Sequence, residues 1–201
     1  MSGILIKSYG APKVNYLEAC RLAGGKSEAL SLKNDLEECY KTFSSGLCYR
    51  VCYKEFPLGK EGDALDLGFA KVCSKDLARA LSGCEGIVLF AATVGSLPDR
   101  MVLRQTSLSP YKALLYQAAG SERVESLCDL FCADLKNELE ERGQTPTPRF
   151  SPGYGDLPLS LQRAVFSALQ PERHLGLTLN DSLLMSPCKS VTAIVGLRSK
   201  S

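Results

Sequence analysis

The sequence predicts an α+β fold in which several packed helices cover a mainly antiparallel sheet. Apolar side chains recur at helical spacing over much of residues 15–43 and 97–142. Short apolar segments of strand length stand apart from these helices, and two of them, at 47–56 and 64–69, are separated by a glycine turn. Because a βαβ nucleotide-binding fold requires helices that alternate regularly with parallel strands, this order of elements disfavours it.

The first part of the chain begins with predicted helices at residues 15–23 and 27–43. The second carries apolar side chains at roughly helical spacing, and Ser27 is placed to cap its N-terminus. Residues 47–56 then alternate with aromatic side chains. Across the glycine turn at 59–62, they are expected to form a hairpin with the strand beyond.

A short helix and a buried strand are expected next. Ser74 precedes a helix that runs to Leu81 and is capped by Gly83. Residues 86–92 form a continuous apolar run of strand length, which indicates a buried strand. This strand ends at residues 93–95, a natural place for a functional site.

The longest helical pattern lies in the middle of the chain. After a predicted helix at residues 97–105, the Ser109-Pro110 pair begins another helix that is expected to end at Gly120. Residues 121–142 are the clearest helix, with an apolar stripe on one side and a glycine directly after the last turn. The stripe consists of Val124, Leu127, Phe131, Leu135 and Leu139.

The C-terminal third contains the remaining predicted elements. Residues 145–148 are interpreted as a connector, and a helix follows at about 158–169. Residues 175–179 and 191–197 are predicted strands. One face of the last strand carries Val191, Ala193, Val195 and Leu197.

Composition is typical of a compact protein with its own core. The chain has 201 residues, of which 45% are hydrophobic and 23% charged. We therefore expect a single domain over 1–201, with residues 1–45 as a helical N-terminal part and 46–201 as an α+β body. A formal net charge of +2 without a basic tract argues against a nucleic-acid partner. The apolar start is too short for a signal sequence, so we expect a cytoplasmic protein without a membrane partner.

Nine cysteines raise the question of disulfides and metal ligands. An odd number spread over the whole chain favours reduced thiols, as in the cytosol. The pairs Cys48/Cys52 and Cys128/Cys132 are spaced too widely for a zinc knuckle, and the chain has a single histidine, His174. The sequence therefore predicts no metal site.

Residues 148–162, which read PRFSPGYGDLPLSLQ, are the segment most informative about function. We call residues 148–158 the arginine loop; its prolines and glycines restrict the backbone, so we expect it to be rigid. Arg149 offers a planar fork of N–H donors that matches a carboxylate or phosphate, and Tyr154 offers a flat ring with a hydroxyl group. This combination suits a small anionic or zwitterionic ligand. The alternative is a surface arginine on a tight turn.

A second motif follows in residues 176–196, GLTLNDSLLMSPCKSVTAIVG. Together with the arginine loop it resembles the activation domain of cobalamin-dependent methionine synthase, whose members carry an Arg-x-x-Pro-Gly-Tyr loop and, after a helix, a Leu-Thr/Asn-(acid)-Ser-x-x-Met-x-Pro-x-x-Ser-Val motif. The resemblance is closest to the free-standing members and, with weaker matches upstream, extends over about residues 16–197. The matching residues are Arg149, Pro152, Gly153, Tyr154, Leu179, Asp181, Ser182, Met185, Pro187, Ser190 and Val191.

The resemblance implies a function. In that family the activation domain binds S-adenosylmethionine over a corrin whose cobalt has been oxidised to the cob(II)alamin state, so that one-electron reduction is followed by methyl transfer. This chain lacks the Asp-x-His-x-x-Gly signature of a cobalamin module, so it would be an accessory activation subunit and not a complete enzyme. Its partner would be a separate cobalamin-dependent methionine synthase that lacks an activation domain and presents the cobalamin. A flavodoxin or ferredoxin-type donor would supply the electron.

The implied S-adenosylmethionine site centres on Arg149, which would bind the methionyl carboxylate. The loop residues Pro152, Gly153, Tyr154 and Gly155 would border the ligand. The supporting residues implied by the second motif and the strand after it are Ser182, Met185, Pro187, Ser190 and Val195. The resemblance implies no catalytic residue and no metal ligand in this chain. Acidic residues that the family places on helices near the ligand have Asp129 as their best counterpart, with an exposed helix face as the alternative.

Departures from the family pattern keep a second hypothesis open. The aromatic residues that border the ligand in the large multidomain enzymes fall at about Val195 and Gly196. The loop also continues as GDLP at residues 155–158, where those enzymes have Pro-Ala-Cys-Pro. The alternative function is a non-catalytic module that docks on a corrinoid protein and has lost S-adenosylmethionine binding.

Overall fold

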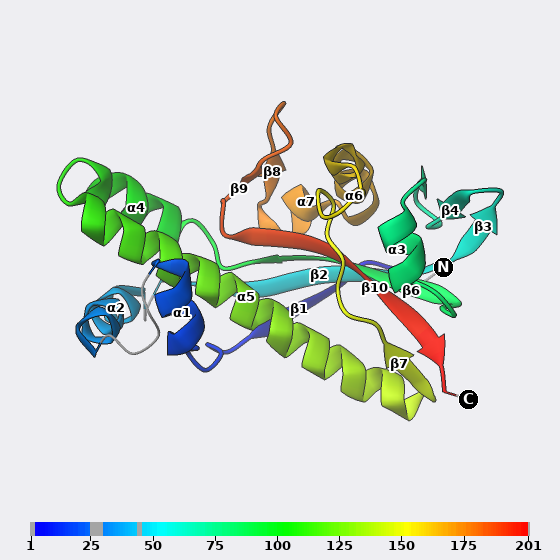
Figure 1. Ribbon diagram of the computed structural model, residues 1–201, viewed down its shortest axis with the longest axis horizontal. Helices are drawn as coiled ribbons and strands as arrows, with labels where there is room; N and C mark the ends of the chain where they lie inside the picture. Colours follow the sequence, from blue (N-terminus) through cyan, green and yellow to red (C-terminus); the bar gives the residue numbers. More distant parts are fainter. Residues whose placement is uncertain (1–2, 25–29, 44–45, 201) are drawn as a thin grey trace.

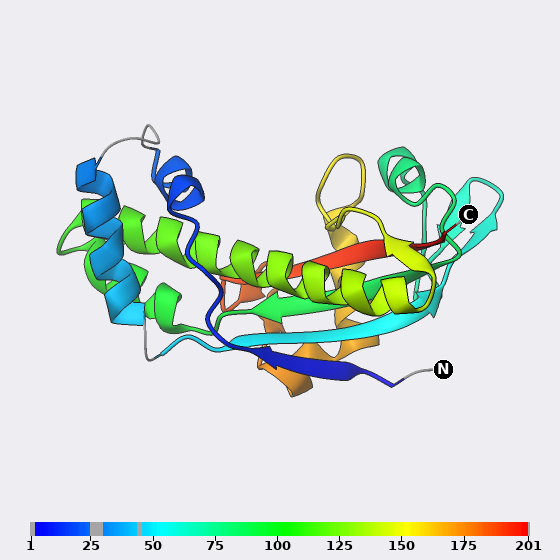
Figure 2. The same ribbon diagram turned by 90° about the horizontal axis from the view of Figure 1, so that it is seen from below.

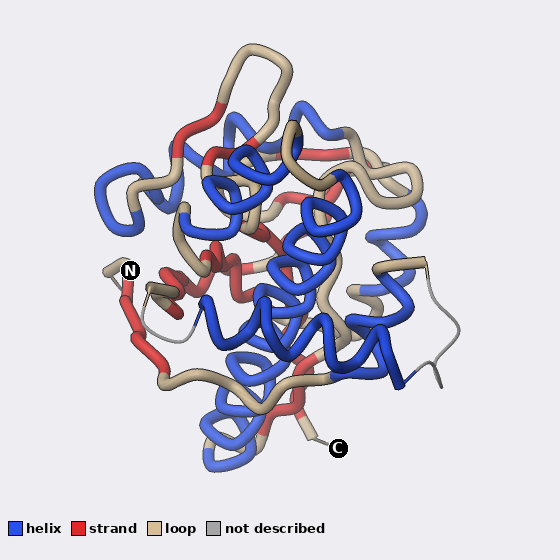
Figure 3. The backbone as a smooth tube through the Cα atoms, turned by 90° about the vertical axis from the view of Figure 1, so that its left-hand side faces the viewer, coloured by secondary structure: helices blue, strands red, loops and turns tan. Residues whose placement is uncertain are grey.

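The computed structural model describes residues 3–24, 30–43 and 46–200. Its centre is a five-stranded sheet with the strand order β1-β2-β6-β10-β7, in which every neighbouring pair is antiparallel (Figure 1). Viewed end-on, the helices lie around these strands (Figure 3). The α+β prediction with a mainly antiparallel sheet is confirmed. The strands are β1 (Leu5–Tyr9), β2 (Tyr49–Pro57), β6 (Gly86–Thr93), β10 (Ser190–Ser199) and β7 (Gln144–Pro146).

Both faces of this sheet are buried. The long helix α5 (Pro110–Glu141) crosses one face (Figure 2), and the predicted apolar stripe of this helix packs there. On β10, Val195 faces α5 whereas its neighbour Ile194 faces the opposite layer, which confirms the predicted alternation. That opposite layer contains α3 (Lys75–Ala80), α6 (Gln162–Leu169) and α7 (Pro171–Leu175).

The helix α5 runs without a break through Gly120, so the prediction that one helix ends there and another begins is wrong. Gly120 is buried against the start of α4 (Leu97–Thr106). A Cβ atom at this position would lie 2.8 Å from Cβ of Pro98. The glycine therefore serves the close approach of two helices, and the good helix formers around it carry α5 through.

The helices α1 (Tyr16–Leu22) and α2 (Leu30–Phe43) pack with α4 and the first turns of α5 into a helical lobe with its own core. Both predicted N-terminal helices are confirmed over the residues that the structure describes, 16–22 and 30–43. The side chain of Asn15 caps α1 by accepting the N–H of Glu18 at 3.1 Å. The expected cap of α2, Ser27, lies outside the described residues.

The N-terminal part is not wholly helical, because residues 5–9 form the edge strand β1 beside β2. This departs from the expectation for residues 1–45. Leu5 and Ile6 are 50% and 46% exposed although they point to opposite faces of the sheet. The strand therefore carries no apolar–polar alternation that a sequence pattern detects, and its position is fixed by pairing with β2.

The predicted hairpin between the strands on either side of the glycine turn is wrong. The turn joins β3 (Gly59–Glu61) to β4 (Ala64–Asp66), and β4 pairs with β5 (Lys71–Val72). β2 instead lies between β1 and β6. Val51 and Cys52 of β2 point to opposite faces and are both fully buried, so this strand requires layers on both sides, which an isolated hairpin does not supply.

Three short elements complete the C-terminal third. The helix expected from about residue 158 begins as a 3-10 turn (Leu159–Leu161) and continues as α6. Residues 144–146, placed in or beside the predicted connector, form β7 at the edge of the sheet. Both differences from the predicted bounds are small. The arginine loop still lies between these two elements.

The predicted strand at residues 175–179 is only partly present. The helix α7 extends to Leu175, and Gly176 ends it with a φ of 71°. The strand is reduced to β8 (Thr178–Leu179), which pairs with β9 (Met185–Ser186). This β8–β9 hairpin projects from the body of the protein beside the start of β10 (Figure 1).

Candidate functional site

The arginine loop follows one fixed path because it is tied to β10 and to itself. Phe150 exchanges two backbone hydrogen bonds of 2.8 Å with Ile194 of β10. Within the loop, the N–H of Gly153 donates to the carbonyl of Leu157 at 2.9 Å, and Leu157 is buried. Gly153 has a φ of 88°, a conformation that glycine adopts without strain. The loop therefore presents its side chains from a defined backbone.

Asp156 ties the far end of the loop to α3. Its carboxylate accepts the N–H groups of Lys75 at 2.7 Å and Asp76 at 3.2 Å, and the hydroxyl of Ser74 donates to it as well. The bond from Ser74, followed by those from the two N–H groups, holds the pKa of Asp156 below its usual range. A Cβ atom on Gly155 would lie 2.5 Å from Oδ2 of Asp76, so this glycine serves packing of the loop on α3.

Arg149 directs its guanidinium group to α5. Its Nη2 donates to Oε2 of Glu125 at 2.6 Å, and Nη1 lies 3.2 Å from Oδ1 of Asp129. The Arg149 side chain is 27% exposed, and the carboxylates are 43% and 75% exposed. Burial alone would lower the pKa of the guanidinium, but the thiol of Cys128 and the two carboxylates outweigh it and raise that pKa. One permanent cation thus stands beside two acidic side chains at the protein surface.

Geometry leaves this cluster incomplete. Nη1 of Arg149 is buried and has no hydrogen-bond partner among the described residues. This nitrogen keeps its ion pair with Asp129 at 3.2 Å but lacks hydrogen-bond geometry, so the cluster gains from a group that supplies a better-placed acceptor. A carboxylate matches the arginine fork best, because it can accept two parallel bonds.

The structure does not bring the side chains of Arg149 and Tyr154 together. Tyr154 lies on the α3 side of the loop, where its ring stands edge-on to Phe150 with 5.7 Å between the ring centroids. It is 72% exposed. The interpretation that these two side chains border one small ligand is therefore not supported by their positions.

One edge of β10 is open beside the loop. β7 pairs with β10 only over Leu197–Ser199, and Phe150 adds one bridge at Ile194. Successive residues of an antiparallel strand direct their backbone N–H and C=O groups to opposite edges. Because those groups of Ile194 face Phe150, those of Thr192 face the same open edge. A ligand at this edge meets a backbone donor and acceptor.

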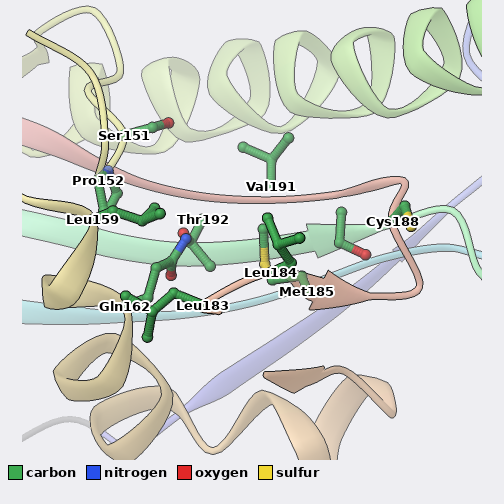
Figure 4. A pocket seen from close by; sticks show the side chains of 11 residues that line it. Ser151, Pro152, Leu159, Gln162, Leu183, Leu184, Met185, Cys188, Val191 and Thr192 are labelled. Atoms are coloured by element: carbon green, nitrogen blue, oxygen red, sulfur yellow. The ribbon is translucent and has the colours of Figure 1, made fainter. Parts of the chain in front are cut away.

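A cavity of about 370 Å³ lies along this open edge (Figure 4), within the usual range of small-molecule sites of about 300–1,000 Å³. Ser151 and Val191 point toward α5, whereas Gln162 and Leu184 lie on the other side of β10. The apolar lining consists of Pro152, Leu159, Leu183, Leu184, Met185 and Val191, and the remaining lining residues are Ser151, Gln162, Cys188, Ser190 and Thr192. Ser151 connects the cavity to Arg149, two residues earlier in the chain.

Pro152, Met185 and Ser190 are the predicted site residues that line this cavity. The Ser190 hydroxyl donates to the carbonyl of Pro187 at 2.8 Å, so Pro187 supports the wall. Ser182 is exposed in the turn of the β8–β9 hairpin and does not line the cavity. Its predicted supporting role therefore has no counterpart in the geometry of the cavity.

Val195 and Gly196 do not border the cavity, so the predicted supporting role of Val195 has no counterpart in the geometry of the cavity. Val195 is 1% exposed and packs under α5. A Cβ atom on Gly196 would lie 2.5 Å from Sγ of Cys84. Neither position has room for an aromatic ring that contacts a ligand, and the cavity wall is formed by other residues.

Sequence reasoning missed residues that α5 and α6 bring to the site. Glu125 binds Arg149, and Gln162 accepts the hydroxyl of Thr192 at 2.9 Å in the cavity wall. A signal for Glu125 exists, because it stands one helical turn before Asp129 and both acids can therefore reach one arginine. Gln162 has no such signal, since its role depends on where α6 packs against β10.

No group of three or more His, Cys, Asp or Glu side chains that could hold a metal ion is present within residues 3–24, 30–43 and 46–200. In the same part of the chain, no helix is both long and apolar enough to cross a lipid bilayer.

Comparison with known proteins bears on the fold. No protein-family model and no curated protein matches the chain. Among solved structures, the chain is similar to the crystal structure of the MetH reactivation domain bound to AdoHcy, with a TM-score of 0.75 and 18% sequence identity. The similarity covers 99% of this chain and 79% of that one. The chain therefore has the fold of a methionine synthase reactivation domain, which agrees with the fold that the sequence resemblance implies.

Proposed function

We propose that this chain binds an S-adenosyl ligand along the open edge of β10 and thereby supports reactivation of a separate cobalamin-dependent methionine synthase by reductive methylation of cob(II)alamin. The observation that carries the proposal is the meeting of two features at Ser151. The incomplete Arg149 cluster lies on one side of this residue and the apolar cavity on the other. The chain also shares its fold with a domain that was solved with AdoHcy.

The Arg149 cluster suits the α-amino acid end of the ligand. A ligand carboxylate can take the arginine fork, and a ligand ammonium can pair with the carboxylates of Glu125 and Asp129. The exchange leaves no charge unpaired, because each internal ion pair is replaced by a pair with the ligand. A ligand with a carboxylate but no ammonium group can pair with Arg149 and leaves Glu125 and Asp129 without a cationic partner. The site therefore favours zwitterionic ligands.

The cavity suits the adenosine end. Apolar side chains such as Leu159 and Leu184 supply contact area for the purine, and the thioether of Met185 is a favourable neighbour of an aromatic ring. The backbone N–H and C=O groups of Thr192 face the same edge and match the polar edge of a nucleobase. In this arrangement the α-amino acid end of the ligand lies on the Arg149 side of Ser151, and the adenosine end lies in the cavity.

The part of the protein in the reaction is positioning. S-adenosylmethionine supplies the methyl group, and the partner enzyme supplies cobalamin. The residues of this chain hold the ligand on a rigid strand edge by its two ends, so that the sulfonium group between them is fixed relative to the docked partner. A flavodoxin or ferredoxin-type protein is the proposed source of the electron. On this proposal, the chain is an accessory subunit that completes no turnover alone.

Isothermal titration with S-adenosylhomocysteine tests the binding step. Arg149→Ala should weaken binding roughly 100-fold, because it removes the charged partner of the ligand carboxylate. The matched control is Arg142→Ala, which removes another arginine–carboxylate pair, with Glu55 at 2.8 Å, away from the cavity. Equal affinities in the two variants would contradict the proposed site.

A second assay tests reactivation. The chain, a reductant and S-adenosylmethionine are added to a methionine synthase that lacks its activation domain and carries cob(II)alamin. The expected result is the absorption spectrum of methylcobalamin, reduced in the Arg149→Ala variant. An unchanged spectrum with a competent electron donor would contradict the reactivation role.

One observation favours the second candidate, a docking module without S-adenosylmethionine binding. The Arg149 fork already contacts Glu125 and Asp129, so the chain satisfies most of this charge without a ligand. This candidate predicts a complex with the corrinoid protein that forms equally well with Arg149→Ala. It also predicts no heat of binding when S-adenosylhomocysteine is added to that complex.

A further inference from the structure

Lys189 lies buried in the turn between β9 and β10. It makes none of the proposed contacts with the ligand. It is 4% exposed. Its ammonium group donates to the hydroxyl of Ser121 on α5 at 3.1 Å. Its aliphatic stem passes Gly120, where a Cβ atom would lie 3.2 Å from Cγ and Cε of the lysine. Because Gly120 has no side chain, the stem of Lys189 can pass beside it and reach Ser121 on α5.

The same turn is tied to the body at further points. The carbonyl of Lys189 accepts the N–H of Val94 at 3.2 Å, and the N–H of Cys188 donates to Oδ2 of Asp99 at 2.7 Å. Cys188 and Ser190, the chain neighbours of Lys189, both line the cavity. A displacement of Lys189 would therefore also displace Cys188 and Ser190 in the cavity wall.

Burying a lysine is unfavourable, so its presence here requires a reason. Burial lowers the pKa of the Lys189 amine more than the carboxylate of Asp99 raises it. An apolar side chain of similar length would pack against Gly120 without that penalty. It would lack the bond to Ser121. The property that the lysine adds is a fixed distance between the turn and α5.

Ser121 lies on the same side of α5 as the two carboxylates that contact the arginine loop, which forms the opposite wall of the cavity. Glu125 and Asp129, one and two helical turns further along, bind Arg149 of the arginine loop. At a rise of 1.5 Å per residue, the anchors of the two walls are about 6–12 Å apart. A single rigid helix therefore carries both walls of the cavity.

We propose that Lys189 is a positioning residue that sets the width of this cavity by holding the turn at residues 187–190 on Ser121 of α5. The inference rests on the proposed function for its ligand. A ligand that engages Arg149 replaces the contacts of that wall with Glu125 and Asp129. The Lys189 wall keeps its anchor during this exchange and gives the ligand a fixed surface.

The test combines a ligand-free and a ligand-bound measurement on the wild type, four single variants and the Lys189→Met/Ser121→Ala double variant. Lys189→Met keeps the length of the side chain and removes the ammonium group, Lys189→Arg keeps the donors, and Ser121→Ala removes the acceptor. Lys112→Met, at an exposed lysine of α5, is the control. Hydrogen exchange in the peptide that spans residues 187–190 should be several-fold faster in Lys189→Met and Ser121→Ala. Lys189→Arg should restore most of the protection, and Lys112→Met should match the wild type.

Titration with S-adenosylhomocysteine should be roughly tenfold weaker in Lys189→Met and in Ser121→Ala, because a hydrogen bond to a charged group contributes on this order. The double variant should bind no more weakly than either single variant, because both remove one interaction. The melting temperature of Lys189→Met should not fall, since the burial penalty of the amine disappears with the bond.

The outcomes separate the two proposals. Unchanged exchange in Lys189→Met overturns the inference, and so does faster exchange with unchanged affinity. If exchange is faster in Lys189→Met but the wild type binds no S-adenosylhomocysteine, the result supports the anchor on Ser121 and contradicts only the proposed function.

Discussion

Two arginine–carboxylate clusters lie next to each other along α5, one within the helix and one between the helix and the arginine loop, and they differ in how completely their polar groups are buried and paired. In the first, Arg123 and Glu122 are 3% and 1% exposed in their side chains. Glu122 accepts the N–H of Asn15 at 2.9 Å and the hydroxyl of Tyr40 at 2.8 Å, and Arg123 donates to the carbonyl of Pro12 at 2.7 Å. This closed cluster joins the helical lobe to the N-terminal segment.

The second cluster, formed by Arg149 with Glu125 and Asp129, is open. It has more carboxylates than cations, its side chains are 27–75% exposed, and one buried N–H of Arg149 has no hydrogen-bond partner among the described residues. Residue type alone therefore does not mark a site. A satisfied and buried cluster stabilises the fold, whereas an incomplete cluster beside a cavity is available to a ligand.

The largest expected effect breaks the closed cluster. Glu122→Ala leaves Arg123 buried without its partner, and we expect the free energy of unfolding to fall by about 3–5 kcal/mol. Glu125→Ala, at the open cluster, should change it by less than about 1 kcal/mol, because that pair is partly exposed. Urea unfolding measures both values. Similar losses in the two variants would contradict the distinction between the clusters.

Arg149→Lys tests whether the open cluster works as a fork. An ammonium group cannot form two parallel bonds with a ligand carboxylate, so affinity for S-adenosylhomocysteine should fall roughly 30-fold. Stability should change by less than about 1 kcal/mol. Calorimetric titration and urea unfolding give the two quantities. Wild-type affinity in this variant would show that a point charge is sufficient.

Glu125→Gln tests the excess of carboxylates. The variant should bind S-adenosylhomocysteine roughly fivefold more weakly, because the ligand ammonium loses part of its charged partner. It should bind an analogue without the α-amino group as well as the wild type does. An equal loss for both ligands would indicate that Glu125 only orients Arg149.

The closed cluster should also appear in the pH dependence of stability. Burial alone would raise the pKa of Glu122, but the hydrogen bonds from Arg123, Ser126 and the N–H of Asn15 outweigh it and hold that pKa below its ordinary value of 4.5. A carboxyl whose pKa is lowered by folding contributes stability that is present above pH 4.5 and is lost as the pH falls through its folded-state pKa. Acid titration followed by circular dichroism should show a steeper loss for the wild type than for Glu122→Gln. Parallel curves would contradict this assignment.

The smallest effect is expected for Tyr154→Phe. The Tyr154 ring is 72% exposed and lies on the α3 side of the loop, away from Arg149. The affinity of the isolated chain for S-adenosylhomocysteine should therefore stay within about twofold of wild type, as for other exposed contacts. A larger loss in the same titration would place the ligand across the loop and not along β10.

Much of the fold could be predicted from local sequence. The apolar stripe of α5, the alternation of β10 and the serine that precedes α3 are confirmed, because each depends on residues close together in the chain. Gly120 misled the prediction, since its reason is the approach of α4. β1 has no pattern of its own and is defined by its pairing with β2.

The candidate site was predictable only in part, for the same physical reason. The loop sequence indicates Arg149, and the second motif indicates Met185 and Ser190, which line the cavity. The partners of Arg149 come from another element, so they depend on how α5 packs on the sheet. Val195 was misplaced because it lies beyond Ile194, where Phe150 of the arginine loop covers the edge of β10 and α5 covers its face.

Calorimetric titration of S-adenosylhomocysteine into the wild-type chain and into Arg149→Ala, with urea unfolding of both proteins, decides whether Arg149 forms a ligand site. We predict saturable binding by the wild type and a roughly 100-fold loss in the variant, while the unfolding free energies agree within about 1 kcal/mol. Absence of binding by the folded wild type, or equal affinity in Arg149→Ala, would contradict the proposed S-adenosyl site at Arg149.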